Sequence, residues 1–346
     1  MDRFELRRQD FSLDADQRAV REGFGDFFAK EVPSSLVRAA EPLGFDADLW
    51  SRLVAMGATT MGLPGSAGGD DATLVDLALV AEEAGRVVAP VPLVAHVVAS
   101  RLLARAAGPA ELLEAAATGE RVVTLALQPS RGAARQLVPE AAVARDVVAF
   151  SPADGLVLHT VEEPAAHVPN QGSTPLAWFD PSAGEATPLA SGAEAEGLFA
   201  GAAAEWKLLT AAALVGITDS CLQLAVEFAK SRRTLGVPIG SLQGIAHPLA
   251  DIATGLHGAR NLVWKAAWFA DHEPGVRPEL PLAAFDYAAR TATEAAWFCA
   301  HAQGGLGFTV EADISLFFLR AKGWSVLAGD PGPGRQQIAA ALLGAV

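Results

Sequence analysis

Three side chains that could bind a phosphate group lie close together in the second half of the chain. Arg232 and Arg233 are adjacent, and the hydroxyl of Thr234 follows directly. A guanidinium group keeps its charge and offers a planar fork of donors that matches phosphate oxygens. Gln243 stands a turn into the next helical pattern and can hydrogen-bond a ligand from the same side. The spacing indicates a phosphate site, although two arginines can also merely complement a helix end.

A second segment with this potential lies near residue 300. His301 is followed by Gln303, Gly304 and Gly305. Because glycine has no side chain, the backbone at Gly304 and Gly305 can approach a ligand closely. We therefore expect a second ligand-binding segment here, and we expect no metal site.

Two long amphipathic helices must position the arginines. Apolar residues recur at steps of three and four, first as Leu208, Ala212, Val215, Leu222, Val226 and Ala229. The second stripe is Leu242, Ile245, Leu249, Ile252, Leu256, Ala259 and Val263. Lys230 and the arginines end the first helix, and Gly236 breaks the chain before the second. The pattern predicts a helical hairpin with an arginine-rich elbow.

Composition narrows the possible partners. The 346 residues carry a formal net charge of −14 and a pI near 4.9. We therefore expect no nucleic-acid partner, and any phosphate must be held by local arginines. Hydrophobic residues make up 51% of the chain, yet no uncharged run reaches the roughly 18 residues that a membrane span requires. The apolar surplus instead predicts subunit interfaces and hence an oligomer.

Two further features concern the compartment. Cys221 and Cys299 lie in apolar helical patterns and are expected to be small, buried and unreactive in a reducing environment. The first residues, MDRFELRRQDF, lack the basic-then-apolar layout of a signal peptide. The expected location is the cytoplasm.

The chain divides into three parts by its sequence pattern. Residues 1–120 are expected to form an N-terminal α-domain, with helices that begin after Asp14, after Asp46 or Asp48, and after Thr73. Residues 121–200 are expected to form a small, reduced middle β-domain with strands near 122–127, 146–150 and 156–160. Residues 201–346 return to helical periodicity and predict a C-terminal bundle. The expected fold class is mainly α with a β insert.

This order of domains, together with two motifs, resembles the acyl-CoA dehydrogenase family. The motifs are AKSRRTLGVPIGSLQGIAHPLADIAT, which leads the bundle, and HAQGGLGFTVEADISLFFLRAK near its end. The resemblance covers nearly the whole chain. In that family FAD lies between the β-domain and a four-helix bundle, and the bundle of the neighbouring subunit holds its ADP half. The family oxidises acyl-CoA thioesters: a carboxylate takes the α-proton, and the flavin accepts a hydride from the β-carbon.

The resemblance implies the cofactor contacts of this chain, namely an FAD shared at a subunit interface by Arg232, Thr234, Leu235, Gln243, His301, Gln303, Gly304 and Gly305. Two of these positions depart from the family pattern. Leu235 stands where a phenylalanine usually packs against the adenine, and His301 stands where a glutamine is common.

The β-domain departs further from the family pattern. Leu127-Gln128-Pro129 replaces a Thr-Glu-Pro-like segment, and Leu137-Val138-Pro139 replaces an aromatic-Ile-Thr segment that contacts the flavin ring. Proline at a donor position removes both a hydroxyl and a backbone N–H. We therefore expect this chain's own ring pocket to be dismantled, unless other donors serve.

The position of the catalytic base also differs from the family pattern. Ala328 precedes Gly329 where many members carry the glutamate, and alanine cannot take a proton. Some branches place the base near the start of the first bundle helix, where this chain has Glu205. Such a base must be a desolvated carboxylate of raised pKa. A glutamate at a helix start is ordinarily a partner of the helix dipole, so both roles stay open.

This chain keeps the residues that would hold the ADP half of a neighbour's FAD, but it lacks the usual contacts to a flavin ring of its own. This combination resembles the smaller, reduced subunit of bacterial heterotetrameric acyl-CoA dehydrogenases that act on steroid side chains. The resemblance implies an unlike partner subunit, an acyl-CoA substrate and an electron-transfer flavoprotein-like acceptor. Two alternatives remain: a self-sufficient homo-oligomeric flavoenzyme with Glu205 as base, and a helical scaffold without flavin.

Overall fold

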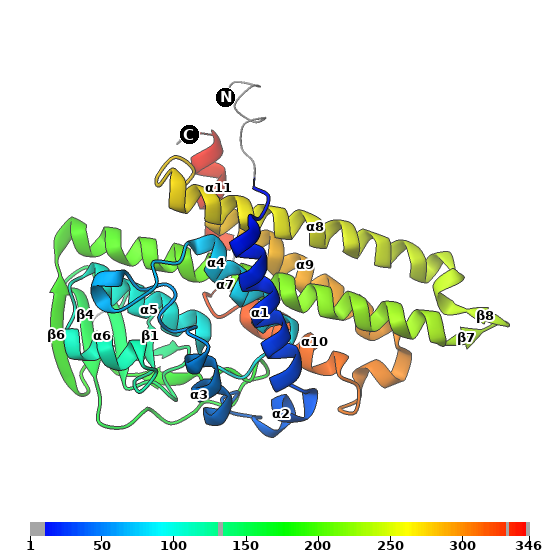
Figure 1. Cartoon of the computed structure of the whole chain (residues 1–346), viewed down its shortest axis with the longest axis horizontal. Coiled ribbons are helices and arrows are strands. Elements are labelled where there is room, and N and C mark those ends of the chain that lie inside the picture. The colour runs from blue at the N-terminus through cyan, green and yellow to red at the C-terminus, as the bar shows by residue number, and fades with distance from the viewer. Residues whose placement is uncertain (1–10, 131–133, 330–331, 344–346) are drawn as a thin grey trace.

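The longest helix, α7 (Gly192–Ser231), runs the length of the molecule and organises its packing (Figure 1). The computed structural model describes residues 11–130, 134–329 and 332–343. The middle of α7 is buried on all sides, from Leu208 to Ile217, as expected for a helix surrounded by other helices. It packs against helices of both the N-terminal part and the bundle.

The N-terminal part is helical, as predicted. It contains α1 (Ala15–Glu31), α2 (Ser34–Ala39), α3 (Ala47–Ala55), the 3-10 helix η2 (Gly65–Ala67), α4 (Leu74–Arg86), α5 (Leu93–Arg105) and α6 (Ala110–Ala117). The predicted caps at Asp14, Asp46 and Thr73 are confirmed, since each side chain accepts from a backbone N–H three residues on. Asp46, rather than Asp48, caps α3.

Within the described residues, the middle part holds two small sheets. In the first, with strand order β1-β3-β4-β6, β1 (Val123–Leu125) pairs in parallel with β3 (Asp146–Ser151), and β4 (Gly155–Thr160) and β6 (Glu185–Ala190) continue antiparallel. In the second, β2 (Gln136–Val138) pairs with β5 (Ala177–Phe179). The three predicted strands correspond to β1, β3 and β4. The sequence did not predict the other strands of these sheets. Strands β2 and β5 have only three residues each, and β6 is mostly exposed, so none of them has a clear apolar pattern.

The first turns of α7 cover the four-stranded sheet. Phe199 stacks on Phe150 of β3 with ring centroids 5.1 Å apart, and Ala195 is fully buried beneath it. The domain boundary that the sequence predicts at residue 200 therefore falls inside α7. The reason is that Gly197 and Gly201 weaken the helical pattern locally, whereas contact with the sheet stabilises the helix there.

The C-terminal part is the predicted bundle. It contains α8 (Gln243–His272), α9 (Leu280–Ala302), η4 (Gly304–Phe308), α10 (Ile314–Ser325) and α11 (Gly332–Leu343) beside α7. The stripe of α8 faces inward, with Leu249, Leu256, Ala259 and Val263 buried. Between α7 and α8 lie the two-residue strands β7 (Arg233–Thr234) and β8 (Val237–Pro238), followed by the 3-10 helix η3 (Ile239–Ser241). The hairpin with its elbow is confirmed.

Among the described residues, α7 is the one helix long and apolar enough to cross a membrane by length and composition. Its most apolar 18-residue window is 67% buried inside the chain. The core helix of a bundle gives this same signal, so the indication of a membrane span is weak.

Both cysteines are fully buried, as predicted. Burial raises the pKa of the Cys221 thiol, and it raises the pKa of Cys299 to about 12. Neither thiol ionises near neutral pH, so neither is a nucleophile.

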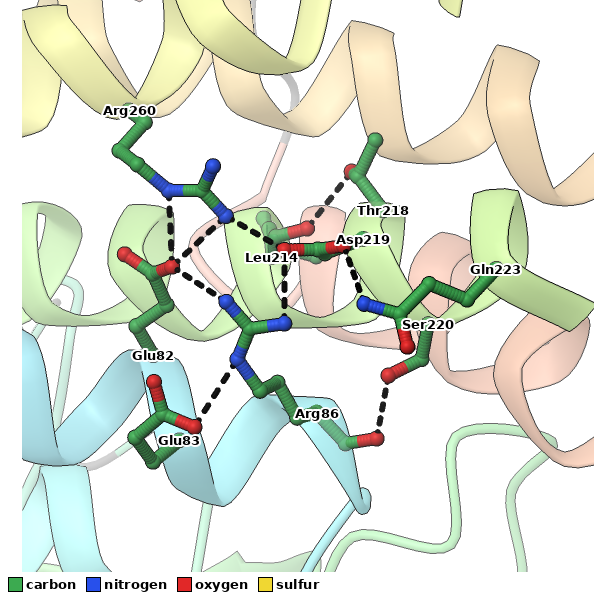
Figure 2. A network of polar contacts seen from close by, with 9 residues as sticks. All are labelled: Glu82, Glu83, Arg86, Leu214, Thr218, Asp219, Ser220, Gln223 and Arg260. Atoms are coloured by element: carbon green, nitrogen blue, oxygen red, sulfur yellow. Dashed lines mark hydrogen bonds and ion pairs between the residues drawn. The ribbon is translucent and has the colours of Figure 1, made fainter. Parts of the chain in front are cut away.

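A network of ion pairs joins the N-terminal part to the bundle (Figure 2). Arg86 of α4 contacts Glu83 at 2.9 Å, Glu82 at 3.1 Å and Asp219 of α7 at 2.6 Å. Arg260 of α8 contacts Glu82 at 2.9 Å and Asp219 at 2.7 Å. Two arginines from different helices thus neutralise carboxylates on α4 and α7.

Burial governs the charges of this network. It raises the pKa of Glu83, although Arg86 opposes that effect. Burial also opposes the ionisation of Asp219, but Arg86 and Arg260 outweigh it and hold its pKa below the usual value. The helices approach closely here, because a Cβ at Gly216 would lie 2.0 Å from the Glu82 carbonyl oxygen. Removal of any one member would therefore leave a buried charge without a partner, which is destabilising.

Candidate functional site

The two arginines at the elbow differ in the contacts of their side chains. The Arg232 backbone is fixed at both ends, since its N–H donates to the Phe228 carbonyl and its carbonyl accepts from Ile239 N–H, each at 2.8 Å. Its side chain is exposed and, among the described residues, forms no hydrogen bond or ion pair. Arg233 Nη1 instead donates to the Gly236 carbonyl at 3.3 Å. The Arg232 guanidinium therefore has no partner among the described residues, and its side chain, unlike its backbone N–H, makes no bond to the helix end.

The hairpin beyond Arg232 carries the next predicted contacts. Thr234 is exposed and pairs with Val237 across a two-residue turn made of Leu235 and Gly236. Both turn residues have positive φ, +49° at Leu235 and +81° at Gly236. This turn type suits a tight hairpin, but it is unfavourable for leucine. The Leu235 side chain is 88% exposed, so no contact within the described chain explains its conformation.

Gln243 is the first residue of α8 and is exposed. No side chain caps this helix start. The N-terminal end of a helix has a partial positive charge and free N–H groups that favour anions. Gln243 therefore lies where an anionic group would be stabilised.

The second predicted segment lies level with Gln243. Helices α8 and α9 are antiparallel, with Gly255 facing Thr291. Twelve residues separate Gly255 from Gln243, and twelve separate Thr291 from Gln303. Gly304 and Gly305 are exposed, and a Cβ at either would meet nothing within 4 Å. Figure 1 shows the elbow and this segment at one end of the bundle, so the fold brings the two predicted half-sites together.

The resemblance places this chain's own flavin ring between the β-domain and the bundle. Unlike the exposed elbow, this region is closed by contacts within the chain. A Cβ at Gly323 of α10 would lie 2.5 Å from the Cα of Gly172, so the two backbones touch. Gln128 Nε2 donates to the Ala328 carbonyl at 2.5 Å and joins the end of β1 to the turn after α10. The gap is closed by the chain itself.

A cavity lies beside this contact, lined mainly by apolar residues such as Trp206, Trp324 and Leu327. Its volume is about 70 Å³, whereas ligand pockets commonly measure about 300–1,000 Å³. A tricyclic flavin ring therefore does not fit in this cavity.

Three polar side chains at this cavity were not predicted from the sequence. The carboxyl oxygen Oε2 of Glu140, Nη2 of Arg320 and Oγ1 of Thr174 are buried and have no hydrogen-bond partner among the described residues. Burial raises the pKa of Glu140 to about 8, so it is largely protonated near neutral pH. Its backbone has φ +64°. Nothing in the local pattern around Leu137-Val138-Pro139 signals such an acid.

The predicted base, Glu205, is held in ion pairs. Its Oε2 accepts from Arg101 Nε at 3.1 Å, and its Oε1 accepts from Arg105 Nη2. The Glu205 side chain is 12% exposed and faces α5, whereas its neighbours Trp206 and Thr210 line the cavity. A carboxylate with both oxygens paired to arginines links helices. This geometry does not support the catalytic role.

Glu205→Gln should accordingly leave turnover of the assembled enzyme within a few-fold of wild type. Removal of a true general base typically costs about 10²–10⁴-fold. Steady-state kinetics at matched flavin content makes the comparison, with Glu194→Gln, an exposed acid of the same helix, as control. A loss in the larger range, with FAD retained, would move the active site into this chain.

The chain belongs to the acyl-CoA dehydrogenase family. Residues 14–115 match the acyl-CoA dehydrogenase N-terminal domain, and residues 201–343 match the C-terminal domain. It is similar to acyl-CoA dehydrogenase IpdE2 of Mycobacterium tuberculosis, at 31% identity over 320 residues that cover 91% of this chain and 94% of the relative. It is thus an oxidoreductase of the acyl-CoA dehydrogenase type.

Solved structures share this fold. The Tcur3481-Tcur3483 steroid acyl-CoA dehydrogenase superposes with a TM-score of 0.84 at 24% identity, over 95% of this chain and 98% of that one. The ChsE4-ChsE5 complex from Mycobacterium tuberculosis gives 0.83 at 22% identity, over 97% and 99%. A glutaryl-CoA dehydrogenase of the same fold from Mycobacterium smegmatis was solved with FADH2 (TM-score 0.82, 18% identity, 98% of this chain and 97% of that one).

Proposed function

We propose that this chain is the reduced subunit of a heteromeric acyl-CoA dehydrogenase and contributes the ADP half of an FAD site to an unlike partner subunit. One contrast carries the proposal: the Arg232 side chain has no partner among the described residues at an exposed elbow, while the gap between this chain's β-domain and α10 is closed. A pyrophosphate bound by Arg232 lies at the end of the bundle, so its flavin ring belongs to a second subunit.

The residues at the elbow suit this role chemically. Arg232 would neutralise the pyrophosphate with two charge-assisted hydrogen bonds, and the exposed Thr234 and Gln243 would add neutral ones. Gly304 and Gly305 let the backbone approach the same group. When bound, FAD would supply hydride acceptance. The partner would supply the base, since Ala328 has no carboxyl group and Glu205 is paired.

The similar structures support a specific reaction and assembly. One is the Tcur3481-Tcur3483 steroid acyl-CoA dehydrogenase, and another is the ChsE4-ChsE5 complex. We propose α,β-desaturation of a steroid side-chain CoA ester by a cytoplasmic heterotetramer that passes electrons to an electron-transfer flavoprotein-like acceptor.

Expression alone and with the unlike subunit tests the proposal. The lone chain is expected to be colourless, because contacts of Gly172 with Gly323 and of Gln128 with Ala328 close the gap between its β-domain and α10. The co-expressed complex is expected to be yellow and to contain one FAD per pair of unlike subunits. An absorbance spectrum and native mass spectrometry provide both measurements.

The same experiment decides between the alternatives. A lone chain with stoichiometric FAD in a stable homo-oligomer would establish the self-sufficient enzyme. A co-expressed complex without flavin would establish the scaffold.

A further inference from the structure

The cavity beside α10 carries three buried polar atoms that the proposed function does not use. They are Oε2 of Glu140, Nη2 of Arg320 and Oγ1 of Thr174, and none of them has a hydrogen-bond partner among the described residues. Buried polar atoms in folded proteins are almost always hydrogen-bonded, to the protein, to water or to a ligand. Three unpaired atoms on residues that line one cavity therefore indicate a place where a small polar molecule binds.

The charge of Arg320 is only partly compensated within the chain. Its side chain is 2% exposed, and Nη1 donates to Glu41 Oε1 at 3.0 Å and to the Leu316 carbonyl at 3.4 Å. Burial lowers the pKa of Arg320 in spite of Glu41, whose own side chain is 34% exposed. A buried cation is stable when it is paired and hydrogen-bonded. The second arm of this guanidinium therefore favours an anionic oxygen.

Glu140 and Thr174 add donors without adding negative charge. Among the described residues that line the cavity, Glu140 and Arg320 are the ones with ionisable side chains. Burial raises the pKa of Glu140 to about 8, so near neutral pH its carboxyl group is mostly protonated and can donate a hydrogen bond. The hydroxyl of Thr174 can donate as well. An anion in the cavity thus meets one cation and two neutral donors.

We propose that this cavity binds a short monocarboxylate of two or three carbons, whose oxygens accept hydrogen bonds from Arg320, Thr174 and Glu140. The site is separate from the elbow and from the proposed FAD half-site. Its volume of about 70 Å³ sets the size of the ligand. An apolar cavity of about 150 Å³ holds benzene, so this one suits a smaller molecule such as acetate.

The other walls decide between a carboxylate and an inorganic anion. Trp206 of α7 and Trp324 and Leu327 near the end of α10 line the same cavity. Their aromatic and aliphatic carbons suit a methyl or ethyl group, and burial of each such group strengthens binding. Phosphate and chloride have no apolar part to place there. The combination of a cationic donor with apolar walls therefore favours a short fatty acid.

Ligand-observed NMR on the full-length chain tests the proposal with formate, acetate, propionate and hexanoate as probes. Affinity is expected to rise about 2–4-fold with each carbon from formate to propionate. Hexanoate should bind more weakly than propionate because it exceeds the cavity. Acetamide, which has the shape of acetate without its charge, should bind about 10-fold more weakly. Equal affinity for acetate and chloride, or no binding of any carboxylate, would overturn the proposal.

Thr174→Val tests the head of the site because it removes one donor and keeps the shape of the side chain. Acetate affinity should fall about 10–100-fold, since the lost hydrogen bond is to a charged acceptor. Thr174→Ser keeps the hydroxyl and should retain most of the affinity. Thr254→Val is the matched control, because Thr254 is an exposed residue of α8 whose hydroxyl donates to the Ala250 carbonyl. Wild-type affinity in Thr174→Val would contradict the assigned contacts.

The pH dependence of binding tests Glu140. In the wild-type chain, acetate affinity should fall as the pH rises through about 8, because Glu140 then ionises and repels the ligand. Glu140→Gln keeps a neutral donor, so it should bind acetate with an affinity that does not change over this range. A fall that persists in Glu140→Gln would overturn the role of this acid. Arg232→Ala should bind acetate as wild type does, so this result is independent of the shared FAD site.

Discussion

Arg232→Ala in the co-expressed complex is expected to weaken FAD retention by about 10–100-fold, although in the proposed assembly the flavin ring is held by the other subunit. A charge-assisted bidentate contact contributes about 1.5–3 kcal/mol, and each 1.4 kcal/mol is a factor of ten in affinity. The Arg232 side chain has no partner among the described residues, so its removal breaks no contact within this chain. The dissociation constant of FAD can be measured by reconstitution of the apo-complex.

Arg233→Ala is the matched control for this prediction. Arg233 is adjacent in sequence and carries the same charge, but its guanidinium is held by the Gly236 carbonyl within the hairpin. Its loss should change FAD affinity much less. Assembly should survive both substitutions, because the buried stripe of α8 is unaltered. If Arg232→Ala retains FAD as wild type does, the shared-site proposal is wrong.

Arg86→Met should reduce the free energy of unfolding of the full chain by about 3–5 kcal/mol, because removal of one partner leaves buried carboxylates unpaired. Arg86 contacts Glu82, Glu83 and Asp219, and Arg260 satisfies only two of these three acids. Methionine keeps the length and apolar stem of the side chain, so the loss reports mainly on charge. Urea unfolding followed by circular dichroism gives the difference.

The deficit of Arg86→Met should also depend on pH. Burial already raises the pKa of Glu83 in the wild-type chain, and Arg86 is the main group that opposes this effect. In the variant the folded-state pKa of Glu83 should rise further above its unfolded value. Stability from such a group is present at low pH and is lost as the pH rises through the folded pKa. The variant should therefore lie closer to wild type at pH 5 than at pH 8.

Lys230→Met is the control for the stability measurement. Lys230 pairs with Glu227 at the surface, and exposed pairs contribute about 0–1 kcal/mol. A loss for Arg86→Met as small as that for Lys230→Met, or a deficit that is the same at both pH values, would contradict the assigned role of the network.

The sequence predicted the elements whose local signals agree with their tertiary surroundings. Asp14 and Thr73 begin helices because their side chains satisfy the first N–H groups, and this chemistry is local. The stripe from Leu249 to Val263 is buried because its period matches the helix. The start of α7 was not predictable in this way. Helix formation from Gly192 onward depends on the contact of Phe199 with the sheet, which is distant in sequence.

The candidate site shows the same division. Arg232, Gln243 and Gly304 were identified by type and spacing, and the fold places them at one end of the bundle. Glu205 was a candidate by position alone, and its pairing with Arg101 could not be predicted because the two residues are about a hundred positions apart. His301 was identified from the resemblance, whereas the exposed Trp297 beside it was not, since periodicity does not say which face of a helix lacks a neighbour.

The length of α7 has a mechanical consequence. Forty residues of helix extend about 60 Å, from the four-stranded sheet to the arginine elbow. One end is anchored by the stack of Phe199 on Phe150, and the other presents Arg232. Because the helix is so long, a tilt of about 2° at the sheet would displace the elbow by about 2 Å. In the proposed assembly the β-domain would thus set the direction in which Arg232 meets the neighbouring subunit, which is a reason for a subunit that holds no flavin ring of its own to keep its sheet.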